Sequence, residues 1–214
     1  MGFSAPMPQG LLILGFGGHA RVVADIAMAL GIKEFCFVDQ AAREGEQFLG
    51  HPVVAGHGPT LPPSWKAFAA SGDAARREAQ CAQIAAAGWP LATLIAPSAT
   101  IGAGAQIGAG TLVAQHAHLG PMARIGEGCI INTGAIVEHE STVGAYSHIS
   151  VHATVAGRSS VGRAVMIGAG ATVIDGVVVG DHITVGAGGV VVRSLQEAGV
   201  YVGVPVRRVG GAGG

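Results

Sequence analysis

The sequence is poor in charged and in aromatic residues. Only 12% of its 214 residues are Asp, Glu, Lys or Arg, the formal net charge is −1, and Phe, Trp and Tyr together make up 5%. A nearly neutral chain offers no electrostatic basis for binding nucleic acid, so this class of partner is excluded. The scarcity of aromatic residues means that the core must consist mainly of small and aliphatic side chains.

Cysteines and long apolar segments are also scarce. Cys36, Cys81 and Cys129 lie far apart and show none of the short spacings of metal or redox motifs, so we expect reduced, structural cysteines. No apolar run approaches the ~18 residues that a membrane helix needs, and the first residues lack the pattern of a signal peptide. We therefore expect a soluble, cytoplasmic protein.

Glycine, in contrast, is abundant, with 36 of 214 residues. From Ile95 to Val191 an aliphatic residue stands at every sixth position without an insertion, and the residue four positions later is mostly small, as at Ala99, Ala117 and Cys129. Hexapeptide repeats of this form predict a parallel β-helix with aliphatic side chains inside and small residues at the corners. Each coil is stabilised by its neighbours, and the flat outer walls favour self-association.

The segment before the repeats resembles part of a nucleotide-binding fold. Residues 11–31, LLILGFGGHARVVADIAMALG, predict a strand, a glycine turn and a helix with one apolar face. Gly15, Gly17 and Ala20 fit G-x-G-x-x-[GA], and Asp39 follows a second predicted strand near the spacing of a ribose-binding acid. A plain glycine turn between a strand and a helix also explains this pattern. The segment is too short for an NAD site, so we favour a half-size domain for one nucleotide.

A third predicted strand, WKAFAAS, is followed by Gly72, Asp73 and a predicted helix, RREAQCAQIAAAG. Gly72 and Asp73 would then lie at the carboxyl end of a parallel strand, where ligands bind in such sheets.

Histidines are concentrated in the repeat region: His116, His118, His139, His148, His152 and His182. None occupies an inward aliphatic position or a small corner position, so we expect their rings on the outer walls or between subunits. His139 stands between Glu138 and Glu140, where almost nothing else is charged. An imidazole, with an unperturbed pKa near ~6.5, is a suitable proton acceptor, and a carboxylate on its other nitrogen would fix the tautomer. Because adjacent strand residues face opposite ways, Glu140 reaches His139 only if a corner intervenes or another subunit supplies the partner.

Three segments, GFGGHARVVADIA, INTGAIVEHESTVGAYSHISVHATVAG and VYVGVPVRRV, are similar to bacterial nucleotide-sugar acetyltransferases of the left-handed β-helix family. Examples of these enzymes are the PglD-type UDP-4-amino-sugar and GDP-perosamine N-acetyltransferases, which are related to sialic acid O-acetyltransferases. The resemblance implies a small Rossmann-like β/α domain at residues 1–92 that binds the nucleotide sugar. It also implies a left-handed parallel β-helix with a C-terminal tail at residues 93–214, and a homotrimer with active sites between subunits.

The same resemblance implies roles for individual residues and acetyl-CoA as the co-substrate, with no metal. It assigns His139 as the general base, Glu140 as its orienting acid and Asn132 as a polar residue of the same site. It places the following residues in the nucleotide-sugar pocket: Gly15, Gly17, Gly18, His19, Asp39, Gly72, Asp73 and His148. It places the following residues in the coenzyme A groove: Gly157, Ala169, Ala187 and Arg207.

The expected function is direct acetyl transfer from acetyl-CoA to the amino group of a UDP- or GDP-linked 4-amino-4,6-dideoxy sugar, for example GDP-perosamine. Cys129 falls on a packed corner position, which argues against an acyl-enzyme. Three alternatives remain: a sugar O-acetyltransferase, a non-catalytic nucleotide-binding scaffold, and a zinc enzyme. The zinc enzyme is the weakest, because His116 and His152 would lie two coils, or roughly 10 Å, apart.

Overall fold

The computed structural model describes residues 8–56 and 58–209. The chain divides into two compact units, Met1–Pro97 and Ser98–Gly214. Within the described ranges no helix has the length and apolar character that crossing a membrane requires. The cytoplasmic location stays a prediction.

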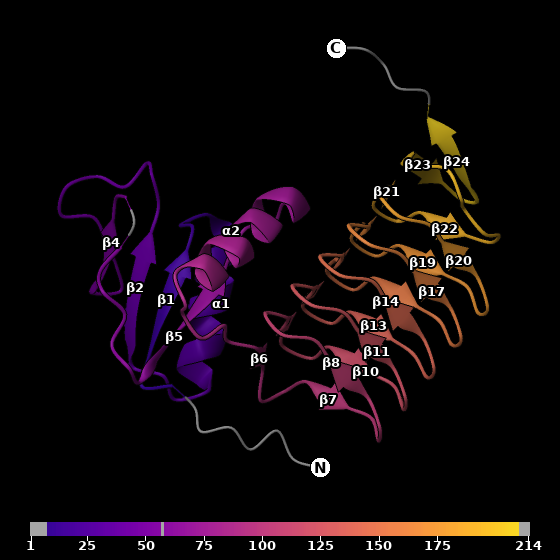
Figure 1. Cartoon of the computed structure of the whole chain (residues 1–214). Coiled ribbons are helices and arrows are strands. Elements are labelled where there is room, and N and C mark those ends of the chain that lie inside the picture. The colour runs from indigo at the N-terminus through magenta and orange to yellow at the C-terminus, as the bar shows by residue number, and fades with distance from the viewer. Residues whose placement is uncertain (1–7, 57, 210–214) are drawn as a thin grey trace. The chain divides into compact units, whose positions relative to one another are not determined.

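The first unit is built on a five-stranded sheet with the order β3-β4-β2-β1-β5 (Figure 1). The strands are β1 (Gly10–Leu14), β2 (Glu34–Val38), β3 (Gln47–Phe48), β4 (His51–Val54) and β5 (Trp65–Ala69), and a short β6 (Leu94–Ile95) follows. β1 pairs in parallel with β2 and with β5. Every residue of β1 is buried, as expected for a central parallel strand that is covered on both faces.

Two helices complete this unit. α1 (Gly18–Ala29) begins directly after the glycine turn, and α2 (Ala74–Ala86) follows β5. In α1, Val23 and Ile26 are buried, whereas Val22 and Leu30 at the edges of the predicted apolar face are half-buried. The three predicted strands and both helices are therefore present.

The sequence analysis missed one hairpin. β3 and β4 are antiparallel and are joined at Leu49 and Gly50, both with positive φ (51° and 82°). Such a two-residue turn matches the twist of a hairpin. β4 also pairs in parallel with β2, at Phe37–Val53. The signal was weak because β3 has only two residues and neither of them is buried.

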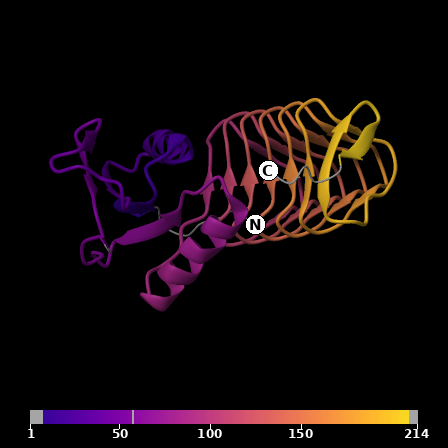
Figure 2. The ribbon, with the colours of Figure 1, turned by 90° about the horizontal axis from the view of Figure 1, so that it is seen from above.

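The second unit is the predicted parallel β-helix, whose coils lie stacked on one another in Figure 2. Strands pair in parallel with the strand eighteen residues later, for example His118 with Ile136. Three hexapeptides therefore make one coil. Wall 1 contains β7 (Thr100–Ile101), β10 (His118–Leu119), β13 (Ile136–Val137), β16 (Thr154–Val155), β19 (Thr172–Val173) and β22 (Val190–Val191).

The other two walls follow in chain order. Wall 2 contains β8 (Gln106–Ile107), β11 (Arg124–Ile125), β14 (Thr142–Val143), β17 (Ser160–Val161) and β20 (Val178–Val179). Wall 3 contains β9 (Leu112–Val113), β12 (Ile130–Ile131), β15 (His148–Ile149), β18 (Met166–Ile167), β21 (Ile183–Val185), β23 (Gly199–Gly203) and β24 (Val206–Val209). We call the turns that follow walls 1, 2 and 3 corner 1, corner 2 and corner 3.

The interior follows the predicted repeat. Aliphatic residues such as Leu119 and Val137 are completely buried, and so is the small corner residue Ser141. The Ser141 hydroxyl donates to the carbonyl oxygen of Ala156 at 2.8 Å and accepts from the amide of Ser159 at 3.2 Å. These hydrogen bonds compensate for the water that the Ser141 hydroxyl loses on burial. The expected fold, a Rossmann-like unit followed by a left-handed parallel β-helix, is confirmed.

Candidate active site

Corner 1 brings His139 and Glu140 together. Glu140 has φ +59°, and the turn carries both side chains to one side of the chain, so that His139 Nδ1 lies 3.4 Å from Glu140 Oε2. A carboxylate only accepts hydrogen bonds, so a neutral imidazole that donates to Glu140 does so from Nδ1 and keeps the lone pair on Nε2. Glu138 accepts from the amide of His139 at 3.3 Å and so belongs to the turn itself. The side chains of His139 and Glu140 are 45% and 60% exposed, so both are accessible in the single chain.

Gly157 lies in the same corner of the next coil and supports the ring of His139. A Cβ atom on Gly157 would lie 2.5 Å from His139 Nε2 and 2.6 Å from Cε1. The neighbouring amide of Arg158 donates to the carbonyl oxygen of His139 at 2.9 Å. Within residues 8–56 and 58–209, the amide of Gly157 donates no hydrogen bond. Corner 1 thus holds a histidine beside a carboxylate and beside a backbone amide that donates no hydrogen bond within the described residues.

Two further charged residues, Arg158 and Asp175, complete this corner, and the sequence analysis did not single them out. Arg158 Nη2 lies 2.7 Å from Asp175 Oδ2. The carboxylate of Asp175, and secondarily that of Glu140, raises the pKa of the Arg158 guanidinium above its usual value. The available signal was the spacing of eighteen residues, which places residues 139, 157 and 175 in one column.

Within one chain, Asn132 does not lie beside His139 in space. It lies at corner 3, where its Nδ2 is 3.0 Å from Nε2 of His148 and its Oδ1 accepts from the amide of Thr133 at 2.8 Å. Within one chain Asn132 and His139 lie at different corners, because successive hexapeptides lie on successive walls, and the expectation that both belong to one site between subunits stays a prediction. Asn132 and His148 form a second polar pair on wall 3.

The residues expected in the coenzyme A groove lie at two corners. Gly157 is at corner 1, whereas Ala169 and Ala187 are exposed at corner 3. They are in adjacent coils, joined through the hydrogen bond from the amide of Gly188 to the carbonyl oxygen of Ala169. Arg207 is exposed in β24. Wall 1 therefore separates Gly157 from the two alanines.

In the first unit, the glycine turn and Asp39 face one pocket of about 300 Å³ at the carboxyl ends of β1 and β2. Asp39 accepts from the amide of Phe16 at 2.8 Å and from the amide of Ala41 at 2.9 Å, which fixes the turn. Among the predicted residues, Gly17 and Asp39 line this pocket. Arg21 and Arg43 line it too and were missed. The guanidinium of Arg21 lies 5.0 Å from the ring of Phe16.

Other predicted residues have structural roles at the end of β5. Asp73 caps α2 by accepting from the amide of Arg76 at 2.9 Å. The buried Arg77 donates to the carbonyl oxygen of Gly72 at 3.0 Å.

Three more predicted residues lie in the glycine turn and in α1. Burial, assisted by the charge of Arg77, lowers the pKa of His19 to about 4, so that the His19 side chain is neutral at physiological pH. Gly15, with φ +104°, lies in the turn, and Gly18 is the first residue of α1.

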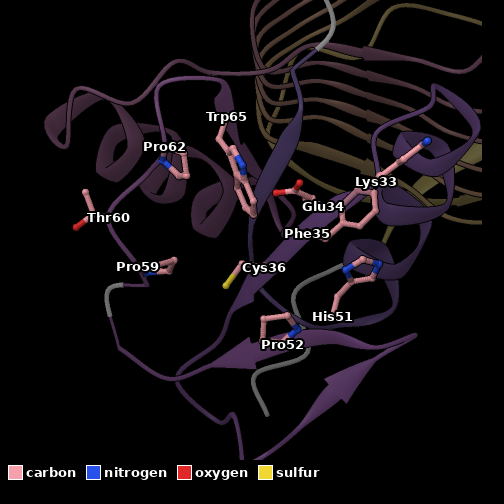
Figure 3. A pocket seen from close by; sticks show the side chains of 10 residues that line it. All are labelled: Lys33, Glu34, Phe35, Cys36, His51, Pro52, Pro59, Thr60, Pro62 and Trp65. Carbon is pink, nitrogen blue, oxygen red and sulfur yellow. The ribbon is translucent and has the colours of Figure 1, made fainter.

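A second pocket of the first unit, of about 440 Å³, lies at the amino ends of β2, β4 and β5. Trp65, Phe35 and His51 surround it (Figure 3). The thiol of Cys36 also lines it, and burial raises the pKa of this thiol, which makes it a poor nucleophile. None of the predicted site residues lines this pocket. Ligands of open α/β sheets bind at the opposite, carboxyl edge.

The remaining histidines form no metal centre in the described ranges, where no group of three His, Cys, Asp or Glu side chains is placed to hold an ion. His116, His152 and His182 occupy positive-φ turn positions at the corners. His118 lies on wall 1 and makes a 2.7 Å hydrogen bond with Thr100. Most of these rings therefore lie at corners rather than on the flat walls.

Comparisons with known proteins extend over both units. The family model of the PglD N-terminal domain matches residues 10–84. The acetyltransferase domain of PglB from Neisseria gonorrhoeae is 32% identical with a TM-score of 0.88, over 94% of this chain and 100% of that one. The same domain was also solved in complex with acetyl coenzyme A, and that structure gives a TM-score of 0.89. A comparison with curated proteins gave no match.

GDP-perosamine N-acetyltransferase from Caulobacter crescentus is also similar, as a histidine-to-alanine mutant in complex with CoA and GDP-perosamine. It is 33% identical with a TM-score of 0.85, over 94% of this chain and 97% of that one. These similarities confirm the resemblance drawn from the sequence. The protein belongs to the family of PglD-type nucleotide-sugar N-acetyltransferases.

Proposed function

We propose that this protein transfers the acetyl group of acetyl-CoA to the amino group of a UDP- or GDP-linked 4-amino-4,6-dideoxy sugar, with GDP-perosamine as a candidate. The observation that carries the proposal is the His139–Glu140 pair at 3.4 Å, which is half-exposed and lies against Gly157. The similarity to acetyltransferases that were solved with acetyl coenzyme A and with GDP-perosamine supports both substrates.

His139 is the proposed general base. Glu140 holds the proton on Nδ1, so Nε2 is free to accept a proton from the attacking nitrogen. The imidazolium that forms is stabilised by the carboxylate, as in a serine triad. The amine attacks the thioester carbonyl, the C–S bond breaks, and the proton on Nε2 passes to the departing sulfur.

The proposed transfer is direct, without an acyl-enzyme. Cys129, the one cysteine of the β-helix, is buried, and its thiol donates to the carbonyl oxygen of Gly144 at 3.1 Å. The amide of Gly157 has no acceptor within the described chain and lies beside His139, so it is the proposed donor to the oxyanion of the tetrahedral adduct.

The nucleotide is proposed to bind in the pocket between the glycine turn and Asp39. The N-terminus of α1, which begins at Gly18, is the proposed binding site of a phosphate, because the helix dipole favours negative charge there. Arg21 and Arg43 line the pocket together with Asp39 and Glu46, and the two guanidinium groups are the proposed contacts to a diphosphate.

Coenzyme A is proposed to bind along the β-helix near Gly157, Ala169, Ala187 and Arg207. These residues lie on both sides of wall 1 within one chain. A homotrimer with active sites between subunits would allow corner 1 of one subunit to meet corner 3 of its neighbour. The trimer, like the position of the coenzyme, is part of the proposal.

The test is a substrate panel. Purified protein is mixed with acetyl-CoA and with UDP-, GDP- or dTDP-linked 4-amino sugars, and thiol release is measured together with the mass of the sugar product. We expect turnover with one nucleotide and a product that has gained one acetyl group on nitrogen. Binding of nucleotide sugars without any thiol release would favour a scaffold, and acetylation on oxygen would favour an O-acetyltransferase.

A further inference from the structure

The column of residues 139, 157 and 175 contains a gap between two reactive side chains. His139 and Asp175 lie in corner 1, in the coils on either side of Gly157, because residues eighteen apart stack. A Cβ atom on Gly157 would lie 2.5 Å from His139 Nε2 and 3.0 Å from Asp175 Oδ1. The side chains of His139 and Asp175 therefore both lie close to Gly157. We call the space above it the Gly157 notch.

The width of the notch fits one nitrogen atom. In the described part of the chain, neither a hydrogen bond nor an ion pair joins His139 to Asp175. The two distances to the same point place Nε2 and Oδ1 at most about 5.5 Å apart, and this range includes the separation of about 4.6 Å that one tetrahedral nitrogen bridges with two hydrogen bonds of about 2.8 Å. A donor placed there would contact the proton-accepting atom and a carboxylate oxygen at once.

Asp175 is held with one oxygen toward the notch. Arg158 Nη2 occupies Oδ2 at 2.7 Å, which leaves Oδ1 for another donor. Arg158 is also within the electrostatic reach of Glu140. Arg193 follows in the same column one coil later, so corner 1 carries the three carboxylates of Glu138, Glu140 and Asp175 and two guanidinium groups; it remains net negative and suits a cationic group.

We propose that the Gly157 notch is the subsite for the acceptor amine, and that Asp175 binds this amine as its ammonium ion and selects it over a hydroxyl group. The inference rests on the proposed function and specifies its acceptor. The ammonium donates one N–H to Asp175 Oδ1 and another to His139 Nε2. A hydroxyl group lacks the charge and the additional N–H donors, so it gains far less from Asp175.

The proposed reaction conserves protons and charge. The bound ammonium first loses a proton through His139 to solvent, which leaves a free amine hydrogen-bonded to Asp175. The amine attacks the thioester carbonyl, and Nε2 takes a second proton from the nitrogen of the adduct. That proton moves to the sulfur as the C–S bond breaks. One ammonium and one thioester thus give one amide, one thiol and one released proton.

If Asp175 had only a structural role, its replacement would lower the melting temperature, whereas we expect almost no change. Its pair with Arg158 is 51% and 60% exposed, and exposed ion pairs contribute little to stability. Asp175→Asn keeps the shape of the side chain and should leave the melting temperature nearly unchanged. Asp181→Asn is the matched control, because Asp181 is an exposed aspartate at corner 2 that accepts from the amide of Arg163 at 2.7 Å.

The experiment measures equilibrium binding of two ligands, the accepted amino sugar and the same nucleotide sugar with a hydroxyl group in place of the amine. A hydrogen bond to a charged group accounts for roughly tenfold to a hundredfold in affinity. We expect Asp175→Asn to weaken binding of the amino sugar by this factor, with unchanged binding of the hydroxyl analogue. Asp181→Asn should change neither.

An unchanged preference for the amine in Asp175→Asn would overturn the inference, and so would an equal loss for both ligands. Kinetics separate this failure from failure of the proposed function. If wild-type protein acetylates the amino sugar and Asp175→Asn has an unchanged KM for it, the subsite is wrong and the enzyme stands. If wild-type protein acetylates no amino sugar at all, the proposed function fails first.

Discussion

Replacing Gly157 by alanine tests whether the position of the His139 ring controls the reaction. The added methyl group would lie 2.5 Å from Nε2 and 2.6 Å from Cε1. Favourable contacts between such atoms require about 3.5–4.0 Å, so the ring must move by about 1 Å. A misplacement of this size costs about a hundredfold in rate, or about 2.7 kcal/mol in transition-state stabilisation.

The fold should tolerate this substitution. Gly157 does not have a positive φ, and the atoms in the way belong to side chains, those of His139 and Asp175, rather than to backbone. The His139 ring is partly exposed and can swing toward solvent. We therefore expect a melting temperature within a few degrees of wild type, alongside a roughly hundredfold loss of kcat/KM in the thiol-release assay.

A double-mutant comparison makes this prediction specific. In a His139→Ala background no ring remains to be displaced, so adding Gly157→Ala should cost little further kcat, although the methyl group still fills the Gly157 notch and should raise KM for the amino sugar. Full activity of the single variant Gly157→Ala would refute the reasoning. Losses of kcat that multiply in the double variant would show that the methyl group acts on the reaction in another way, for example through the coenzyme.

Three further predictions concern individual side chains. Glu140→Gly removes the orienting carboxylate and relieves a positive φ of 59°. The free energy of unfolding should therefore rise by up to about 1 kcal/mol, while kcat falls at least about tenfold. Glu140→Gln keeps the strained backbone, so thermal melts and kinetics of this variant separate the two effects. Asp39→Asn leaves one acceptor where two amides donate, so KM for the nucleotide sugar should rise about tenfold with kcat unchanged, and a lower kcat would contradict a binding role. His19 has a pKa lowered to about 4 in the folded protein against about 6.5 when unfolded, so stability should be unaffected above pH 6.5 and fall by up to about 3 kcal/mol as the pH decreases to 4; in urea denaturation at several pH values, His19→Gln should lose this dependence.

Much of the fold could be predicted because its signals are periodic. The aliphatic residues six apart predict the β-helix, and the pairing at eighteen residues follows once three walls are assumed. Strands β1, β2 and β5 of the β/α unit follow from short apolar runs before turns. The β3–β4 hairpin has no such run, because β3 consists only of Gln47 and Phe48.

The candidate site could be predicted only in part. His139 and Glu140 are adjacent in sequence, so the pair was visible, but their contact depends on the turn geometry at Glu140. Asp175 is far from His139 in sequence and carries no local motif. Its placement depends on the stacking of coils and on the missing side chain at Gly157. Arg21 was missed because an arginine on an exposed helix face is common, and the pocket beside it exists only in three dimensions.

The most direct test of the account is the rate of thiol release from acetyl-CoA in the presence of the accepted amino sugar, measured for His139→Ala beside His182→Ala. His182 is an exposed histidine at corner 2 and serves as the matched control. We predict a fall in kcat of about 100- to 10,000-fold for His139→Ala, the contribution of a general base, and no change for His182→Ala. Undiminished turnover of the His139→Ala variant would contradict the assignment of the base.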